Sequence, residues 1–315
     1  MLSYKGTREA FTKALIDLSA DDDRFMLVSP DSLKAMRATP FADKYPERYI
    51  EVGIAEQNAV AVAAGLASTG LIPFVATYGG FITMRACEQL RTFVAYPHLN
   101  VKFIGINSGI FGGEREGVTH QFFEDLGIVR SIPGITVVAP ADEHQVYHAV
   151  KAIANIDGPV YLRAGNGREH VVYDQDTPFE LGKIRVLKEY GNDAALFANG
   201  FIMNRALEAA AILNAQGIKV TLADVHTLKP IDVDGITTIL TKCGAAVTVE
   251  DHNIIGGLAD AVAKVSTDHH PAPIGRIGLQ DVFPGSGPAE AVLDCYGMAV
   301  QDIVTAVKTV LNRKK

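Results

Sequence analysis

Residues 49–68 read YIEVGIAEQNAVAVAAGLAS, and within this stretch one residue pattern gives way to another. A short β-rich run comes first, Gly53 permits a tight turn, and alanine-rich helical spacing begins near Glu56. A strand that passes through a glycine turn into a helix is typical of parallel sheets whose faces are covered by helices. The stretch therefore predicts an α/β fold.

The same alternation of strand and helix patterns extends to either side of this stretch. The expected strands are Phe25–Val28, Tyr49–Glu51, Phe74–Ala76, Val101–Ile106, Thr136–Ala139 and Val160–Arg163, and the expected helices are Thr7–Leu18, Glu56–Ser68, Ile82–Val94 and Glu143–Ile156. This order predicts a parallel sheet with helices on both faces. Ligands of such sheets bind beyond the carboxyl ends of the strands, so the loops that follow the strands are the expected place for chemistry.

A second series of the same kind begins near Asp193. Its segments are Ala194–Ala198, Asn204–Gln216, Lys219–Asp224, Ile231–Lys242, Ala245–Glu250 and Gly257–Ser266, followed by a helical tail at Ala299–Lys315. The charged, turn-rich stretch Tyr173–Gly191 separates the two series and is expected to be the linker. The fold class is therefore α/β, with two doubly wound domains at residues 1–175 and 192–315, the second smaller than the first.

Composition excludes several classes of protein. The chain has 315 residues, of which 48% are hydrophobic and 21% charged, with a net charge of −7. These values exclude broad disorder and argue against a nucleic-acid partner. Three isolated cysteines form no CxxC pair, so neither a disulfide framework nor a zinc site is expected, and no metal ligands are assigned. We expect no membrane partner and a cytoplasmic location, since no apolar run approaches the ~18 residues of a membrane span.

Two groups of residues after expected strands attract attention in the first half of the chain. Glu56 opens a helix in the motif Glu51-Val-Gly-Ile-Ala-Glu-Gln-Asn. A carboxylate there fits a helix cap favoured by the dipole, or an acid directed at a nitrogen heterocycle. Tyr78, Phe81 and Met84 recur every three residues. That spacing is typical of core packing, and the alternative is a flat apolar surface for an aromatic ring.

Two further candidates follow the strands Val101–Ile106 and Val160–Arg163. Residues 112–121 read GGEREGVTHQ, a glycine-rich loop without the spacing of a dinucleotide-binding turn or a P-loop. Its His120 is either a structural histidine or a group that exchanges a proton with a reacting oxygen near neutral pH. Arg163 ends its strand and is either a ligand for phosphate or sulfonate, or a member of a surface ion pair.

Taken in order, the motifs of this chain resemble those of the transketolase family over essentially its whole length. They are Thr7-Arg-Glu-Ala-Phe, Phe41-Ala-Asp-Lys-Tyr-Pro-Glu-Arg-Tyr, Val52-Gly-Ile-Ala-Glu-Gln-Asn, Arg85-Ala-Cys-Glu-Gln, Thr119-His-Gln, Ile132-Pro-Gly-Ile, Pro140-Ala-Asp, Leu228-Lys-Pro-Ile-Asp and Glu250-Asp-His-Asn-Ile-Ile-Gly-Gly-Leu. More narrowly, the chain is similar to the C-terminal subunit of a split transketolase. The resemblance implies a pyrimidine-binding domain followed by a transketolase C-terminal domain.

The resemblance also implies a partner chain. The diphosphate-binding half of the family carries a Gly-Asp-Gly sequence that holds the metal and the diphosphate, and this sequence is absent here. We therefore expect an N-terminal, diphosphate-binding subunit to hold the Mg²⁺ (or Ca²⁺), in a hetero-oligomer such as α2β2. The implied activity is transfer of a two-carbon ketol unit from a ketose to an aldose, with thiamine diphosphate as cofactor.

Roles can be transferred residue by residue from the resemblance. Glu56 matches the catalytic glutamate that hydrogen-bonds N1′ of the aminopyrimidine. Tyr78 and Phe81 match the aromatic pair that packs on that ring, and Met84 is a further candidate cofactor-binding residue because it lies at the same spacing. His120 matches a catalytic and substrate-binding histidine near the oxygens of the donor sugar. Arg163 matches an arginine that binds the terminal phosphate of the sugar.

Departures from the family pattern concern the sugar. Glu116 stands in for a loop aspartate that recognises a substrate hydroxyl, and a family histidine is missing near Asn107. The segment around Ser32 also differs, and Ser32, Lys34 and Arg37 are candidate contacts to an anion. A specialised transketolase for a sulfosugar or a branched pentulose phosphate is one alternative. The others are the beta subunit of a 2-oxo acid dehydrogenase decarboxylase and a non-catalytic regulatory subunit.

Overall fold

The first half of the chain builds a seven-stranded sheet. The computed structural model describes residues 4–113 and 116–314. The sheet has the order β10-β5-β6-β4-β3-β1-β2, with β1 Phe25–Ser29, β2 Tyr49–Glu51, β3 Ile72–Tyr78, β4 Lys102–Ile106, β5 Thr136–Val138, β6 Val160–Arg163 and β10 Thr227–Lys229. Strands β1 to β6 pair in parallel, and β10 alone among these runs antiparallel to its neighbour β5. Because the central strands are buried on both faces, they read as apolar runs, which is why the sequence pattern located them.

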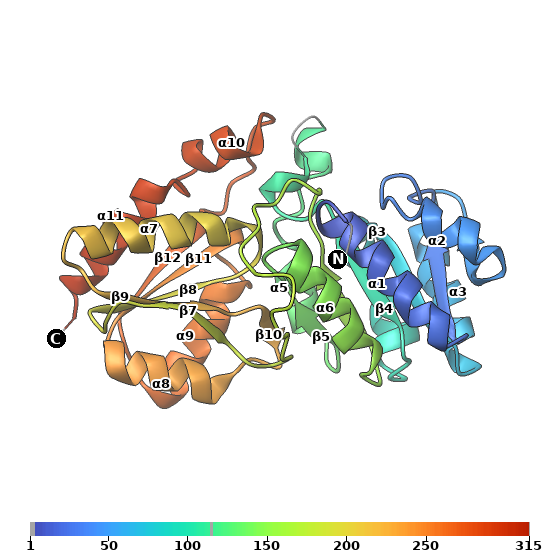
Figure 1. Ribbon diagram of the computed structural model, residues 1–315, viewed down its shortest axis with the longest axis horizontal. Coiled ribbons are helices and arrows are strands. Elements are labelled where there is room, and N and C mark those ends of the chain that lie inside the picture. The colour runs from blue at the N-terminus through green and yellow to red at the C-terminus, as the bar shows by residue number, and fades with distance from the viewer. Residues whose placement is uncertain (1–3, 114–115, 315) are drawn as a thin grey trace.

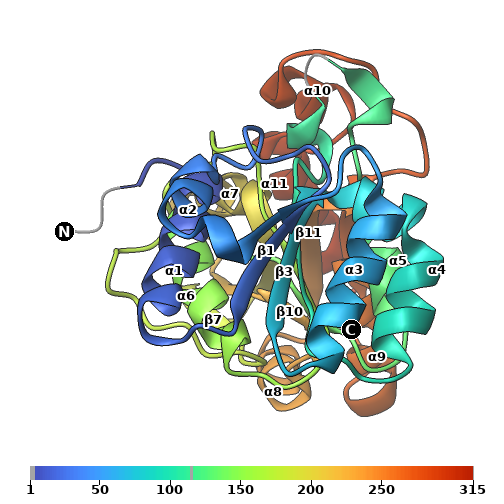
Figure 2. The same ribbon diagram turned by 90° about the vertical axis from the view of Figure 1, so that its right-hand side faces the viewer.

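Helices cover both faces of this sheet, as Figure 2 shows. One face carries α1 Thr7–Asp21, α2 Thr39–Lys44 and α6 Glu143–Ala154, and the other carries α3 Glu56–Ser68, α4 Cys87–Gln89 and α5 Asp125–Ser131. Short helical turns complete this half at η1 Pro46–Arg48, η2 Phe81–Arg85, η3 Leu90–Ala95, η4 Ile110–Gly112 and η5 Gly117–Thr119. The α/β class with a parallel sheet is confirmed.

The helix expected at Ile82–Val94 differs from the regular pattern. Two of its three segments, η2 and η3, are π-helical, with a backbone bond from Ala86 N to Phe81 O at 3.2 Å. A π turn inserts one residue per turn and is often found at functional sites. Periodicity of 3.6 residues does not reveal it, and its effect is to shift the register of the side chains that follow Phe81.

The second half builds a five-stranded sheet in the order β12-β11-β8-β9-β7. Its strands are β7 Arg185–Glu189, β8 Ala194–Ala198, β9 Val220–Asp224, β11 Ala246–Asn253 and β12 Ile274–Leu279. The helical elements are η6 Gly200–Ile202, α7 Met203–Ala215, α8 Val233–Cys243, α9 Leu258–His269, α10 Ala289–Cys295 and α11 Val300–Leu311. Figure 1 shows α7 and α11 above this sheet and α8 and α9 below it.

The two halves of the chain are connected by shared sheet strands and backbone hydrogen bonds, and not only by the expected linker. The expected linker Tyr173–Gly191 contains β7, which pairs antiparallel with β9, and β10 from the second half completes the first sheet. The backbone of Ala139 donates to His226 O at 2.7 Å, and that of Asn253 donates to Phe123 O at 2.7 Å. Within the described ranges, no helix is both long and apolar enough to cross a bilayer.

Candidate active site

Glu56 lies at the first turn of α3, where the sheet edge meets the helix. Gly53, with φ 69°, makes the tight turn between β2 and α3. The Glu56 side chain is buried, with only 3% of the residue exposed, and its Oε1 accepts a hydrogen bond from Nη1 of Arg85 at 2.7 Å. The positive end of the α3 dipole also favours a carboxylate here. The result is a buried acid held by one partly exposed cation.

An aromatic cluster lies at the carboxyl end of β3 and in the loop before α5. It consists of Tyr78, Phe81, His120 and Phe122. The ring centroids of Tyr78 and Phe81 are 5.4 Å apart, and His120 lies 5.3 Å from Tyr78 and 5.4 Å from Phe81, edge-on to both. Thr119 Oγ1 is 3.0 Å from Nδ1 of His120, so the hydroxyl fixes the ring orientation. The structure thus brings three of the expected site residues together.

The residues beside this cluster define its edges. The Arg85 guanidinium lies 4.1 Å above the Phe81 ring and so links the cluster to Glu56. Met84 is 42% exposed, which excludes the alternative that it packs in the core. Gly80 is required because a Cβ there would lie 1.9 Å from Phe122 Cδ1. The cluster is therefore packed tightly on its inner side and open on the side of Met84 and Arg85.

A polar cavity of about 310 Å³ adjoins the cluster at Tyr78. Its lining is rich in positive charge and comes from loops far apart in the sequence: Arg8, Ala35, Arg37, Tyr78, Asn107, Gly112, Glu116, Asn166, Gly167 and Arg168. Three guanidinium groups face one described carboxylate, that of Glu116, which is exposed. The excess of positive charge suits an anionic ligand.

Arg8 holds the walls of this cavity in place. It donates to Ala35 O at 2.9 Å, to Gly165 O at 3.4 Å and to Oδ1 of Asn107. Burial lowers the pKa of Arg8 from its ordinary value. Neither Arg8 nor Arg168 was expected at the site from the sequence. The signal available was the Thr7-Arg8 motif at the start of α1, but nothing local shows that this turn reaches loops about 100 and 160 residues away.

The structure corrects the predicted role of Arg163 as a phosphate ligand. Its side chain is 1% exposed, and its Nε and Nη2 donate to the two oxygens of Asp125, each at 3.0 Å, while Nη2 also donates to Phe122 O at 3.2 Å. Tyr161 donates to the same carboxylate at 2.7 Å. The expected phosphate ligand is therefore the cation of an ion pair, and this pair is buried rather than on the surface, where the alternative interpretation of the sequence placed it.

Ser32 is also placed away from the cavity. It is buried, and its hydroxyl lies 2.6 Å from Thr77 Oγ1 and 3.2 Å from Pro30 O. Both contacts tie the loop after β1 to the sheet and to itself. The expected anion contact at Ser32 is replaced by an internal bond, whereas Arg37, from the same loop, does line the cavity.

Buried titratable groups gather where the two halves meet, next to the Arg163–Asp125 pair. His252 is fully buried, and burial lowers its pKa to about 4. Its Nδ1 donates to Asn253 O at 2.6 Å, and its Nε2 accepts from Gly127 N at 3.3 Å. Burial raises the pKa of Glu250 to about 7, although its oxygens accept from two backbone amides at the start of α9. His252 thus links the two halves through Gly127, Glu250 fixes the start of α9, and neither residue lines the cavity.

Family models and known sequences match this architecture. Residues 4–167 match the family model for the transketolase pyrimidine binding domain, and residues 182–303 match that for the transketolase C-terminal domain. A 6-deoxy-6-sulfo-D-fructose transketolase subunit, SqwH, of Clostridium sp. (strain MSTE9) is 37% identical, covering 98% of this chain and 95% of that protein. One of the subunits of the apulose-4-phosphate transketolase of Phocaeicola vulgatus is 33% identical, covering 94% of each chain.

A solved structure is similar over the same length. It is described as a split gene transketolase, inactive beta4 tetramer, and has a TM-score of 0.90 and 39% sequence identity, covering 99% of this chain and 100% of that one. The likeness extends over both domains, so the two-domain arrangement is shared as well as each fold.

Proposed function

Since this chain belongs to the transketolase family, as a pyrimidine-binding domain followed by a C-terminal domain, we propose that it is the C-terminal subunit of a split, thiamine diphosphate-dependent transketolase. It would transfer a two-carbon ketol unit from a ketose to an aldose. The single observation that carries the proposal is the buried carboxylate of Glu56 beside the Tyr78–Phe81–His120 cluster.

The described residues fit the pyrimidine of the cofactor. A planar nitrogen heterocycle needs an apolar aromatic surface and a hydrogen-bonding group at its edge, and the cluster and Glu56 supply these. When bound, thiamine diphosphate supplies the electron sink for carbon–carbon bond cleavage. Glu56 would share a proton with the ring nitrogen through Oε2, since Arg85 donates to Oε1. Exclusion of water from this carboxylate strengthens that hydrogen bond.

His120 is assigned to the substrate. Its ring stands edge-on to both aromatic side chains and is half-buried, so one edge remains for a ligand. Thr119 lies at its Nδ1, which leaves Nε2 to donate to, or accept a proton from, a sugar oxygen. Tyr78 lines the polar cavity as well as the cluster, so a ketose held at His120 would direct its far end into the arginine-lined space.

We assign that far end to a terminal anion, phosphate or sulfonate. The cavity presents Arg8, Arg37 and Arg168, and guanidinium groups bind the oxygens of either anion well. The two relatives named for their substrates act on a sulfofructose and on apulose 4-phosphate, sugars that both carry such an anion. A specialised ketose is therefore a second candidate beside a common ketose phosphate, and both share this chemistry.

The partner subunit would cover the face around Glu56. Ile54, two residues before Glu56, is 76% exposed, and Met84, next to the Arg85 that binds Glu56, is 42% exposed, so both offer apolar surface to a partner. The chain lacks the Gly-Asp-Gly sequence of the diphosphate-binding half. A partner carrying that sequence, with Mg²⁺ or Ca²⁺, would complete the site, in a hetero-oligomer such as α2β2.

The test is reconstitution. The chain is mixed with a subunit that carries the Gly-Asp-Gly motif, thiamine diphosphate and Mg²⁺, and is offered xylulose 5-phosphate, fructose 6-phosphate, 6-sulfonated fructose, apulose 4-phosphate or pyruvate, with glyceraldehyde 3-phosphate as acceptor. Two-carbon transfer from one or more ketoses supports the proposal. Pyruvate turnover without ketose turnover would instead favour a 2-oxo acid decarboxylase, and activity unchanged by Glu56→Ala would favour a non-catalytic subunit.

A further inference from the structure

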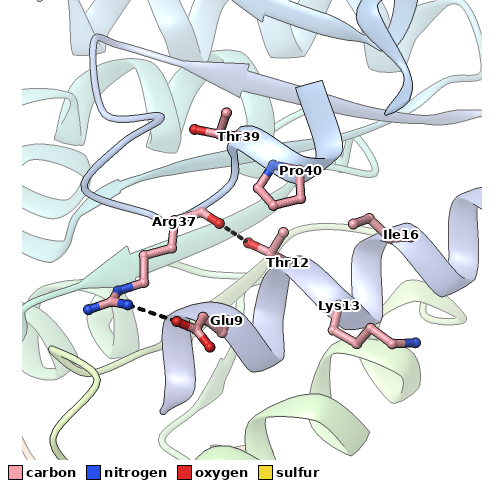
Figure 3. A pocket seen from close by; sticks show the side chains of 7 residues that line it. All are labelled: Glu9, Thr12, Lys13, Ile16, Arg37, Thr39 and Pro40. Atoms are coloured by element: carbon pink, nitrogen blue, oxygen red, sulfur yellow. Dashed lines mark hydrogen bonds and ion pairs between the residues drawn. The ribbon is translucent and has the colours of Figure 1, made fainter. Parts of the chain in front are cut away.

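Arg37 lies between two hollows of the first domain. It lines the polar cavity described above and also a groove of about 410 Å³ between α1 and α2. Figure 3 shows this groove, with Arg37 extending toward Glu9 while Thr12 approaches the Arg37 backbone. The groove is lined by Glu9, Thr12, Lys13, Ile16, Arg37, Thr39 and Pro40. Arg37 is the residue that the two linings share.

The backbone of Arg37 is held in an uncommon conformation. Its φ is 55°, in the left-handed region that side chains other than glycine rarely adopt. Thr12 Oγ1 donates to the Arg37 carbonyl at 3.3 Å, and the amide of Arg37 donates to Lys34 O at 3.1 Å. Such conformations persist where surrounding structure fixes them, and they occur often at ligand sites. Asn107, in the lining of the same cavity, also has a positive φ, of 52°.

Glu9 is the counter-ion of Arg37. Nη1 of Arg37 lies 2.7 Å from Glu9 Oε1, and the other oxygen, Oε2, accepts from the backbone of Lys5 at 2.8 Å. The two side chains are 56% and 32% exposed, so water screens the pair only in part. Glu9 adds a negative charge at the rim of a cavity whose own lining has three arginines and Glu116.

We propose that Glu9 and Arg37 form a specificity-determining pair, in which Arg37 contacts the terminal anion of the sugar and Glu9 competes with that anion for the guanidinium. This proposal rests on the proposed function. An anion entering the cavity must share or displace the Glu9 carboxylate, so the pair sets how strongly the cavity prefers an anionic over an uncharged ketose. Because one partner is exposed, the coupling is modest and falls as ionic strength rises.

The experiment compares two variants and a charge-matched control in the reconstituted complex. The quantity compared is the KM for a phosphorylated ketose divided by the KM for its unphosphorylated form. Glu9→Gln should lower this ratio about threefold, and Arg37→Gln should raise it about fivefold. The kcat of Glu9→Gln should stay within about twofold of wild type, since Glu9 neither lines the polar cavity nor lies at the Glu56–His120 cluster. The control is Glu47→Gln, which removes an exposed charge of the same sign, paired with Arg48, that lines neither hollow.

A second measurement does not depend on turnover: the affinity for inorganic phosphate is measured by calorimetry on the same complexes. Tighter phosphate binding in Glu9→Gln and weaker phosphate binding in Arg37→Gln support the pair. They do so even if the wild-type complex transfers no ketol unit, because absence of transfer would overturn only the proposed function. The pair is overturned if Glu9→Gln and Glu47→Gln change KM and phosphate affinity equally. The proposed pair is also overturned if Arg37→Gln leaves both the KM and the phosphate affinity at their wild-type values.

Discussion

Replacing Arg163 with methionine should unfold the chain more easily without changing how it recognises a sugar. The substitution removes two hydrogen bonds of 3.0 Å to the Asp125 carboxylate and one of 3.2 Å to Phe122 O. Both members of the pair are within 1% of complete burial, so the Asp125 charge would remain without its cation. Breaking a buried pair from one side costs about 3–5 kcal/mol of stability.

The assay is urea denaturation of the purified chain, followed by circular dichroism, with two companion variants. Arg276→Met removes a half-exposed pair with Asp260 and should cost about 0–1 kcal/mol. The double variant Arg163→Met/Asp125→Leu replaces both charges with apolar side chains and should recover much of the loss, because the Asp125 charge is removed together with its cation.

Kinetics separate a structural arginine from a phosphate ligand. If Arg163 acts only through Asp125, the ratio of KM values for phosphorylated and unphosphorylated ketoses should remain within about twofold of wild type in the reconstituted complex. The reasoning is refuted if Arg163→Met has wild-type stability and raises the KM for the phosphorylated ketose about tenfold or more.

Three further predictions concern chemistry, pH and assembly. Glu56→Gln should reduce the kcat for ketol transfer by roughly 10²-fold or more, as loss of a catalytic acid–base group does, and a rate within threefold of wild type would contradict the assignment. Burial raises the pKa of Asp224 from 3.8 to about 7, so the folded state binds a proton that the unfolded state releases, and stability should fall as pH rises from about 4 to 7. Asp224→Asn should therefore gain stability relative to wild type by roughly 4 kcal/mol at pH 8 and by little at pH 4, as measured by urea midpoints, and an equal difference at both pH values would contradict it. Ile54→Asp should weaken binding of the diphosphate-binding partner about tenfold or more in analytical ultracentrifugation, while an unchanged dissociation constant would place the interface elsewhere.

The central strands could be predicted from the sequence, and the reason is physical. β1, β4 and β6 are buried on both faces, so each reads as a continuous apolar run. β7 could not be predicted because four of its five residues are exposed, and because no local sequence pattern indicates that it pairs with β9. The π-helical turns after Phe81 could not be predicted either, because they do not follow the 3.6-residue period.

The residues of the candidate site also differ in whether the sequence could predict them. Glu56 and His120 could be placed because each follows a strand within a recognisable motif, and Tyr78 and Phe81 because they lie at and just after the end of a strand; the structure brings the three rings together. Their catalytic and cofactor-binding roles stay predictions. Arg163 could not be assigned from sequence, since its partner Asp125 lies 38 residues earlier on a helix that the pattern did not reveal.

The most direct test of the whole account follows the two carbons themselves. The reconstituted complex is given a [1,2-¹³C₂]ketose with an unlabelled aldose acceptor, and the product ketose is examined by NMR. The account predicts that both labelled carbons appear in the product as C1 and C2 with their ¹³C–¹³C coupling intact, and that Glu56→Gln slows this transfer by roughly 10²-fold or more. Loss of the coupling, release of labelled carbon dioxide, or full transfer by Glu56→Gln would contradict it.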